Sequence, residues 1–191
     1  MSRVLREVAA LDGQLDAVSG KQLLRAESAA LNKSAALSRT RVVRLVAKEV
    51  GVPQKLIRGR LYINKSTPKR RRARLLAYVK GVSLIHLNPR DTGKGGWRRR
   101  KGKGVRARGG HHYPDAFVAR GLNGRQQVFE RNLKVSYRDG KKYHHVDVVR
   151  LPIEKEVERH AARVTREIMS SRLGDLLSHE MAWRLQKAGA K

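Results

Sequence analysis

The spacing of apolar residues predicts helices in the first third of the chain. Near the N-terminus these residues recur at alternating steps of four and three, which is a helical period close to a short heptad seam. The members of this seam are Val4, Val8, Leu11, Leu15 and Val18. A second helical stretch follows over residues 21–50, and the alanines and serines in its middle would let another backbone approach closely. Because glycine is a poor helix former, we expect a break between the two stretches near Ser19 and Gly20.

The second stretch ends at a glycine that suits a helix C-terminus. Gly51 follows the last helical residue, and Pro53 suits the first turn of a short helix over residues 53–61. The segment 45–61 has two interpretations: an ordinary packed corner, or a helix-turn-helix whose second helix reads a DNA groove. In the second interpretation the side chains offered to DNA are Gln54, Lys55, Arg58 and Arg60.

The middle of the chain changes to the period of two that is typical of strands. Alternating positions predict strand-like runs over residues 75–87. The pair Asn123-Gly124, flanked by AFVARGL and RQQVFER, is a strong hairpin signal. Asp139-Gly140 marks a second turn, between LKVSY and YHHVDVVRL. Both turns predict antiparallel pairing.

The helical period returns after Pro152, which ends the strand region. One apolar stripe consists of Val157, Ala161, Val164 and Ile168. The stripe shifts at residues 170–174, where we expect a bend in the helix.

This order of elements predicts an α+β fold, in which a small antiparallel sheet is flanked by N-terminal helices and a long C-terminal helix. We expect a single domain over residues 1–191. Its expected parts are a helical part over 1–62, antiparallel strands over 73–151 that include a basic loop over 89–114, and a C-terminal helix over 153–187.

Basic residues are strongly in excess along the chain. Lys and Arg number 44 against 16 Asp and Glu, which gives a formal net charge of +28. Such a charge favours polyanions, so nucleic acid is the first partner class to consider and acidic protein surfaces are the second.

The densest basic segment is GKGGWRRRKGKGVRARGG, residues 93–110, and it contains no acid. Basic, glycine-rich loops of this kind neutralise phosphates without reading base sequence. Trp97 could stack on a base or anchor the loop to a partner. The predicted nucleic-acid-binding residues are Lys94, Arg98, Arg99, Arg100, Lys101, Lys103, Arg106 and Arg108. The tract PKRRRAR, residues 68–74, is either a solvated connector or part of the same electropositive surface.

The sequence carries no motif for catalysis or for a cofactor. It has no cysteine, which excludes disulfides, thiol catalysis and Cys-based zinc sites. The glycine-rich segment lacks the spacing of a P-loop or of a dinucleotide-binding turn. His111-His112 and His144-His145 each offer only one ligand per strand face, which makes a poor metal site. We therefore expect no enzyme activity, no cofactor and no metal site.

Hydropathy gives no sign of membrane association. No run of about eighteen apolar residues occurs, and the first residues do not form a signal peptide. We expect a soluble protein of a cytoplasm, or one carried inside an assembly.

Several segments together resemble the minor tail protein Z family of long-tailed, lambda-like bacteriophages, whose members are also called tail completion proteins. The resemblance spans most of the chain and is carried by AALNKSAALSRTRVVRLVAKEVGVPQKLIRGRL, GVSLIHL, DAFVARGLNGRQQVFER and DVVRLPI. None of these segments is a catalytic motif, so the match consists of their order and spacing.

The resemblance implies a structural virion protein at the head-proximal end of a tail, present in the host cytoplasm during assembly, without enzyme activity or cofactor. It also implies kinship with the α+β fold of tail terminators and, because tails have six-fold symmetry, a hexameric ring. The implied partners are the tail terminator, tail tube, tape measure and connector proteins, and the end of the viral double-stranded DNA. The basic segment would then contact DNA or dock on an acidic partner protein, and the sequence leaves both open.

The alternative from another class is a cytoplasmic nucleic-acid-binding protein. It would be a helix-turn-helix DNA binder or a ribosomal-type RNA binder, because an isoelectric point near 11.5 and glycine-rich basic loops suit both.

Overall fold

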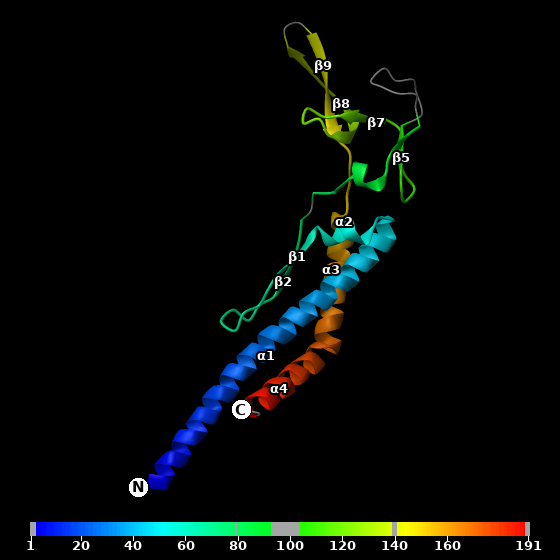
Figure 1. Cartoon of the computed structure of the whole chain (residues 1–191). Helices are drawn as coiled ribbons and strands as arrows, with labels where there is room; N and C mark the ends of the chain where they lie inside the picture. The colour runs from blue at the N-terminus through cyan, green and yellow to red at the C-terminus, as the bar shows by residue number, and fades with distance from the viewer. Residues whose placement is uncertain (1–2, 79, 93–103, 139–140, 190–191) are drawn as a thin grey trace. The chain divides into compact units, whose positions relative to one another are not determined.

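The computed structural model describes residues 3–78, 80–92, 104–138 and 141–189, and these residues form an α+β fold as predicted (Figure 1). The helices are α1 (Arg3–Val50), α2 (Gln54–Arg58), α3 (Glu154–Ser171) and α4 (Leu173–Gly189), with a 3₁₀ turn, η1, at Leu84–Leu87. The sequence suggested one small sheet, but the described strands form four separate antiparallel sheets.

The four sheets differ in size and in the span of chain they join. A two-stranded sheet joins β1 (Leu61–Asn64) to β2 (Arg74–Ala77), and another joins β3 (Val82–Ser83) to β10 (Arg150–Leu151). A three-stranded sheet has the order β4 (Arg90–Asp91), β5 (Val105–Ala107) and β6 (His111–Tyr113). The longest strands form the order β7 (Ala116–Arg120), β8 (Gln126–Arg138) and β9 (Lys141–Val148).

The chain folds into two compact units that alternate along the sequence. The first unit contains Met1–Val42, Leu61–Ala77 and Arg159–Lys191, which supply most of α1, the β1–β2 hairpin, most of α3 and all of α4. The second unit contains Val43–Arg60 and Tyr78–Glu158, which supply the end of α1, α2 and the other three sheets.

Helix α1 buries a line of residues spaced four apart. The line consists of Ala26, Ala30, Ser34, Ser38, Val42 and Val46. Its first four members are alanine or serine, so the small residues that the sequence places in the middle of this stretch form the buried side of α1. The apolar seam predicted at Val4, Val8, Leu11, Leu15 and Val18 involves side chains outside the described part of the chain.

The predicted break near Ser19 and Gly20 is wrong, because α1 is continuous over 48 residues. A helical glycine costs only about 1 kcal/mol relative to alanine, and helix propagation on both sides offsets that cost. Gly20 is exposed and a Cβ there would meet no atom within 4 Å, so the glycine is not required for a close approach.

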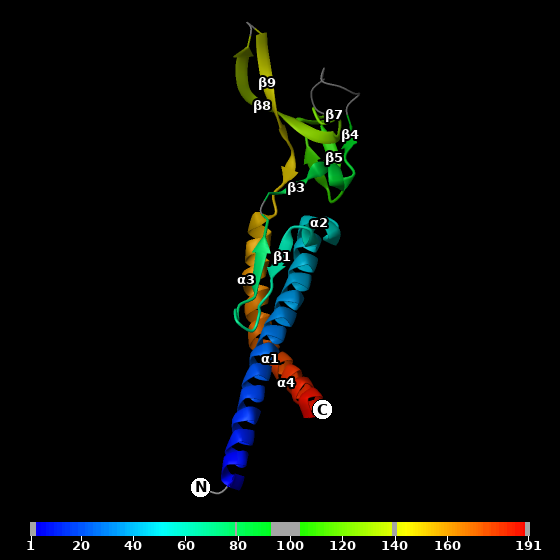
Figure 2. The same ribbon diagram turned by 60° about the vertical axis from the view of Figure 1, so that its left-hand side comes forward.

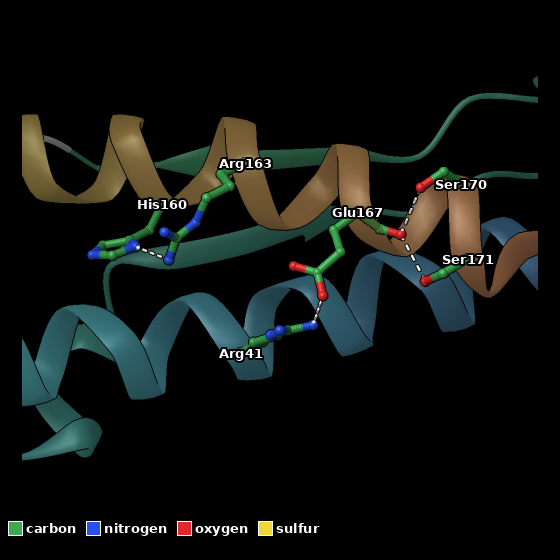
Figure 3. A network of polar contacts seen from close by, with 6 residues as sticks. All are labelled: Arg41, His160, Arg163, Glu167, Ser170 and Ser171. Atoms are coloured by element: carbon green, nitrogen blue, oxygen red, sulfur yellow. Dashed lines mark hydrogen bonds and ion pairs between the residues drawn. The ribbon is translucent and has the colours of Figure 1, made fainter.

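Ion pairs show that α3 and α4 run antiparallel to α1 in the first unit. The Nζ of Lys33 lies 2.6 Å from Oε1 of Glu180 in α4, and Nη1 of Arg41 lies 2.6 Å from Oε1 of Glu167 in α3. Figure 3 shows the second pair, and it also shows Ser170 and Ser171 donating hydrogen bonds to the carbonyl oxygen of Glu167. The helix then breaks at Arg172, within the predicted bend.

The β1–β2 hairpin corrects the predicted boundary of the helical part at residue 62. Helix α2 ends at Arg58, and Leu61 begins β1, where its side chain is fully buried. Figure 2 shows the hairpin alongside α1. Asn32 of α1 bonds the hairpin directly, because its amide accepts from the Ser66 N–H (2.7 Å) and donates to the Ser66 carbonyl (3.0 Å).

In the second unit, the corner after α1 forms as the sequence predicted. Gly51 has a φ of +70°, and the N–H of Val52 donates to the carbonyl of Ala47 at 3.0 Å. This is the six-to-one bond of a Schellman motif, which satisfies one of the free carbonyls at the helix end. Pro53 lies just before α2 and outside its first turn.

The predicted antiparallel hairpins are also present. Arg120 pairs with Gln126 across the turn that contains Gly124, whose φ is +72°. β8 and β9 flank Asp139-Gly140 and pair with each other up to Arg138 and Lys141. Asp139 and Gly140 themselves lie outside the described part of the chain.

One strand prediction is wrong, because residues 84–87 form the 3₁₀ turn η1. Leu84 and Leu87 are both buried, and residues three apart lie on one side of a 3₁₀ turn. A short apolar run such as SLIHL fits both periods, so the alternation alone did not decide between them.

The buried ion pair of α1 and α4 generates a prediction on stability. The hydrogen bond from Lys33, with Arg184 nearby, lowers the pKa of Glu180 below 4.5. Its stabilising contribution is therefore complete above pH 4.5 and is lost as the pH falls below that value. We expect E180Q to lower the free energy of unfolding by about 1–3 kcal/mol at neutral pH and by much less near pH 3. Urea unfolding followed by circular dichroism at both pH values measures this.

The matched control is E167Q. Glu167 is also paired at 2.6 Å with a cation of α1, but 47% of its side chain is exposed, against 9% for Glu180. Solvent screens the exposed pair, so the control should change the free energy of unfolding by about 0–1 kcal/mol. Equal effects of the two variants would contradict the role assigned to burial.

Candidate nucleic-acid interface

The β4–β5–β6 sheet places a row of basic residues on one face. Arg90 pairs with Arg106, and Arg106 pairs with His112. Directly opposite residues of antiparallel strands point to the same face, with Cβ atoms about 4.5–5.5 Å apart. All three side chains are exposed, and Arg108, which follows β5, is exposed as well. This set, Arg90, Arg106, Arg108 and His112, is called the cationic row below.

The other face of the same sheet packs inward. Val105 is fully buried and Tyr113, its partner across the strands, is half-buried. Burial, and to a smaller extent the negative charge of Glu130, raises the pKa of Tyr113 above 10.0. The alternation of basic and buried positions therefore fixes which face of this short sheet meets solvent.

The cationic row is held by the corner at the end of α1. The Nε2–H of His111 donates to the carbonyl of Val50 at 2.9 Å, because a carbonyl can only accept. The turn between β5 and β6 approaches the corner so closely that a Cβ on Gly109 would lie 2.5 Å from the Gly51 oxygen. In addition, the N–H of Arg108 donates to the carbonyl of Leu87 at 2.9 Å. These contacts fix the backbone that carries Arg106, Arg108 and His112.

The residues on either side of segment 93–103 are bonded to each other. The N–H of Thr92 donates to the carbonyl of Gly104 at 3.1 Å, and the Thr92 hydroxyl donates to the same oxygen at 2.9 Å. Gly104 has a φ of +28°, and a Cβ there would collide with the carbonyl oxygen of Tyr113. The position therefore requires glycine. We call this pair of hydrogen bonds the Thr92–Gly104 clasp.

The structure locates two of the eight residues predicted to bind nucleic acid. Arg106 lies on β5 and Arg108 immediately after it, both exposed. The other six lie outside the described residues: Lys94, Arg98, Arg99, Arg100, Lys101 and Lys103. Trp97 lies outside them as well. The clasp connects this undescribed basic segment to the sheet that carries the cationic row.

The expected basic loop over residues 89–114 is corrected by the presence of β4, β5 and β6 within it. Sequence reasoning consequently missed Arg90 and His112 as neighbours of Arg106. A signal was present, because Gly109-Gly110 separates the alternating runs VRA and HHY, and both glycines have positive φ. A glycine pair between alternating runs predicts a tight hairpin, and the hairpin places His112 opposite Arg106.

The helix-turn-helix interpretation of residues 45–61 does not fit the observed corner. Helix α2 has five residues and a length of about 7.5 Å, and its Ile57 is buried. Arg60 lies after the helix, where its guanidinium stacks on the Tyr78 ring at 5.6 Å. The segment is an ordinary packed corner that supports the β5–β6 turn.

Neither a metal centre nor a membrane span is found in the described residues. Among them, no three or more His, Asp or Glu side chains gather in an arrangement that could hold a metal ion. No helix in the same part of the chain combines the length and the apolar character needed to span a bilayer.

Comparison with known proteins identifies the relatives of this chain. Residues 9–188 match the family described as prophage minor tail protein Z (GPZ). The chain is 27% identical over 146 residues to the tail completion protein of Escherichia phage N15, and the alignment covers 73% of each protein. No solved structure matches.

The close approach of the β5–β6 turn to Gly51 generates a prediction with an internal control. Gly109 and Gly110 have similar φ values, +91° and +80°, but a Cβ on Gly110 would meet nothing within 4 Å. G110A should cost about 1–2 kcal/mol of stability for the left-handed backbone alone. G109A should cost more than this, because the alanine Cβ also collides with the Gly51 oxygen.

Thermal unfolding of both variants measures the difference. Equal losses of stability in G109A and G110A would show that the β5–β6 turn does not pack closely against Gly51.

Proposed function

The chain belongs to the prophage minor tail protein Z family, and from this premise we propose that it is a structural protein that completes the head-proximal end of a bacteriophage tail. The observation that carries the proposal is the family match over residues 9–188, which covers nearly the whole chain. The name of the phage N15 relative, a tail completion protein, supports the same role. The proposed role requires no catalysis and no cofactor.

Within the tail, the proposed assembly is a homo-oligomeric ring of six copies next to the terminator, tube, tape measure and connector proteins. The six-fold symmetry expected of such tails supports this number. A ring uses heterologous contacts, in which different patches of neighbouring subunits meet. Each copy then presents the same basic surface at an equivalent position around the ring axis.

The proposed contact with the genome uses phosphates. Arg90 and Arg106 carry like charges on directly opposite positions, an arrangement that destabilises a strand pair until an anion lies between or above them. The clasp attaches the basic segment 93–103 to this sheet, so the segment and the cationic row belong to one cationic region of the chain. Contacts from arginine and lysine to phosphates do not depend on base sequence, which suits a protein that must meet any genome end.

An acidic partner protein is the competing ligand for the same region. The two ligands differ in their salt dependence, because each phosphate neutralised on duplex DNA contributes about −0.9 to the slope of log K against log salt. The following experiment uses this difference.

We expect replacement of Lys94, Arg98, Arg99, Arg100, Lys101, Lys103, Arg106 and Arg108 by serine to weaken duplex binding and to flatten its salt dependence by several units of slope. Phage carrying this variant should assemble tails but retain or position DNA poorly. Fluorescence anisotropy with a labelled duplex and counting of filled particles measure the two effects. Unchanged DNA affinity together with normal infectivity would overturn the DNA contact and leave the acidic partner.

The position in the virion is tested separately. We expect the protein in purified particles and, by immunogold labelling, at the end of the tail that joins the head. Native mass spectrometry of the purified protein or of its complex with tail proteins should show six copies. Absence from particles would overturn the proposed function, whereas a different copy number would overturn the six-fold ring alone.

A further inference from the structure

The turn of the β1–β2 hairpin carries a second concentration of basic residues, in the first unit. Between the two strands the chain reads KSTPKRRRA, which contains five basic residues and no acid. All five of these side chains lie on the exposed surface: Lys65, Lys69, Arg70, Arg71 and Arg72. The sequence left this tract as either a solvated connector or part of one electropositive surface.

The turn is a built structure, unlike a solvated connector. The carbonyl of Arg70 accepts from the N–H of Thr67 (3.0 Å), the N–H of Arg72 (2.7 Å) and the hydroxyl of Ser66 (3.1 Å). The Thr67 hydroxyl in turn accepts from the N–H of Arg70 at 3.1 Å. Asn32 of α1 holds Ser66 by two further hydrogen bonds, so the basic turn has a fixed place on the helix.

A hollow of about 530 Å³ lies between this turn and α1. Leu24 and Pro68 give it an apolar lining, and Lys21, Arg25 and Lys69 bring three cations to it. Lys21 and Arg25 are one helical turn apart, so they lie on the same side of α1. No acidic side chain lines the hollow among the described residues.

The nearest acid of this region already has a partner. Glu27, two residues after Arg25 in α1, accepts from Nη1 of Arg71 at 3.4 Å. Within the described part of the chain, no ion pair is formed by Lys21, Arg25, Lys69, Arg70 or Arg72. Three of these cations, from the turn and from α1, therefore line one hollow, and the other two are exposed next to Lys69 in the same hydrogen-bonded turn.

We infer that Lys21, Arg25, Lys69, Arg70 and Arg72 form a second site for the phosphate groups of a nucleic-acid backbone. Several cations distributed over a turn and a helix face match a chain of phosphates better than a single small anion, which two or three of them would neutralise. The inference rests on the proposed contact of this protein with nucleic acid, but it uses none of the residues of the cationic row or of segment 93–103.

The test compares three variants of the 191-residue chain, and a fourth, K21Q/R25Q, tests the α1 side of the hollow. The hairpin variant is K69Q/R70Q/R72Q. The control is K155Q/R166Q/R172Q, which removes three exposed cations of α3 and of its C-terminal end, so the loss of net charge is equal. The third is the serine variant of the basic segment described above.

Anisotropy of a labelled duplex of mixed sequence is measured between about 50 and 200 mM NaCl. The hairpin variant should bind at least about tenfold more weakly than the control at the lower salt, with a salt slope smaller in magnitude by about 2–3. K21Q/R25Q should weaken binding in the same direction, since both cations line the same hollow. Circular dichroism of each variant checks that the helices are intact.

Each remaining outcome decides between the sites. If the hairpin variant binds like the control while the basic-segment variant binds weakly, the second site is overturned and the proposed genome contact stands. Loss with the hairpin variant alone supports the second site and overturns the role of the basic segment. Loss of poly-L-glutamate binding with unchanged duplex binding would assign the hairpin to an acidic polypeptide and overturn the inference.

Discussion

The first unit depends on one buried line of small side chains along α1. Residues spaced four apart from Ala26 to Ser38 are alanine or serine, and all are buried. Four residues turn an ideal helix about 40° beyond a full turn, so the buried line winds gradually around the axis. The hairpin bonds α1 at Asn32 and α4 pairs with Lys33, two consecutive residues that point to different sides of the helix, whereas α3 pairs with Arg41 about two turns further along. Larger side chains on this line would have no room without displacing the groups that bury it.

This arrangement gives the polar contacts of the first unit unequal roles. In the pair of Lys33 and Glu180 the carboxylate is largely shielded from water, so loss of the lysine would leave a poorly solvated negative charge. The pair of Arg41 and Glu167 is open to solvent and contributes little by itself, although it marks the alignment of the two helices. The small residues form the buried side of α1, and the two ion pairs show which residues of α3 and α4 lie beside it.

The second unit uses backbone geometry for the same purpose. Its three-stranded sheet is too short to be stable alone, and its buried face contains few apolar side chains. The sheet is held because Gly51 and Gly109 allow two backbones to come together and because His111 caps the end of α1. These contacts stabilise the sheet, and the stabilisation offsets the repulsion between Arg90 and Arg106 on the solvent face.

Much of this could be read from the sequence, for identifiable reasons. The hairpin at Gly124, the corner at Gly51 and the helix after Pro152 each have a local signal that requires no knowledge of the rest of the chain. Two features were missed. The continuity of α1 across Gly20 depends on the helix that extends on both sides of the glycine, and the 3₁₀ turn at Leu84 depends on what packs against its side chains.

The candidate interface was harder to predict than the fold. The density of positive charge marked residues 93–110 as the candidate interface. The pairing of Arg90 with Arg106 depends instead on the register between β4 and β5, which the charge does not reveal. Similarly, the tract 68–74 gave no sign of Lys21 and Arg25 beside it, because that neighbourhood arises when the hairpin docks on Asn32. Sequence reveals how many cations a segment has, whereas only the fold shows which distant cations join them.

The Thr92–Gly104 clasp forms without any side chain of the basic segment. The bonds that close the clasp involve one hydroxyl, one N–H and one carbonyl, and none of them depends on the side chains of residues 93–103. Substitution of those side chains can therefore change the charge of the segment without removing either hydrogen bond of the clasp. Gly104 has no such freedom, because any Cβ there would collide with the Tyr113 carbonyl oxygen.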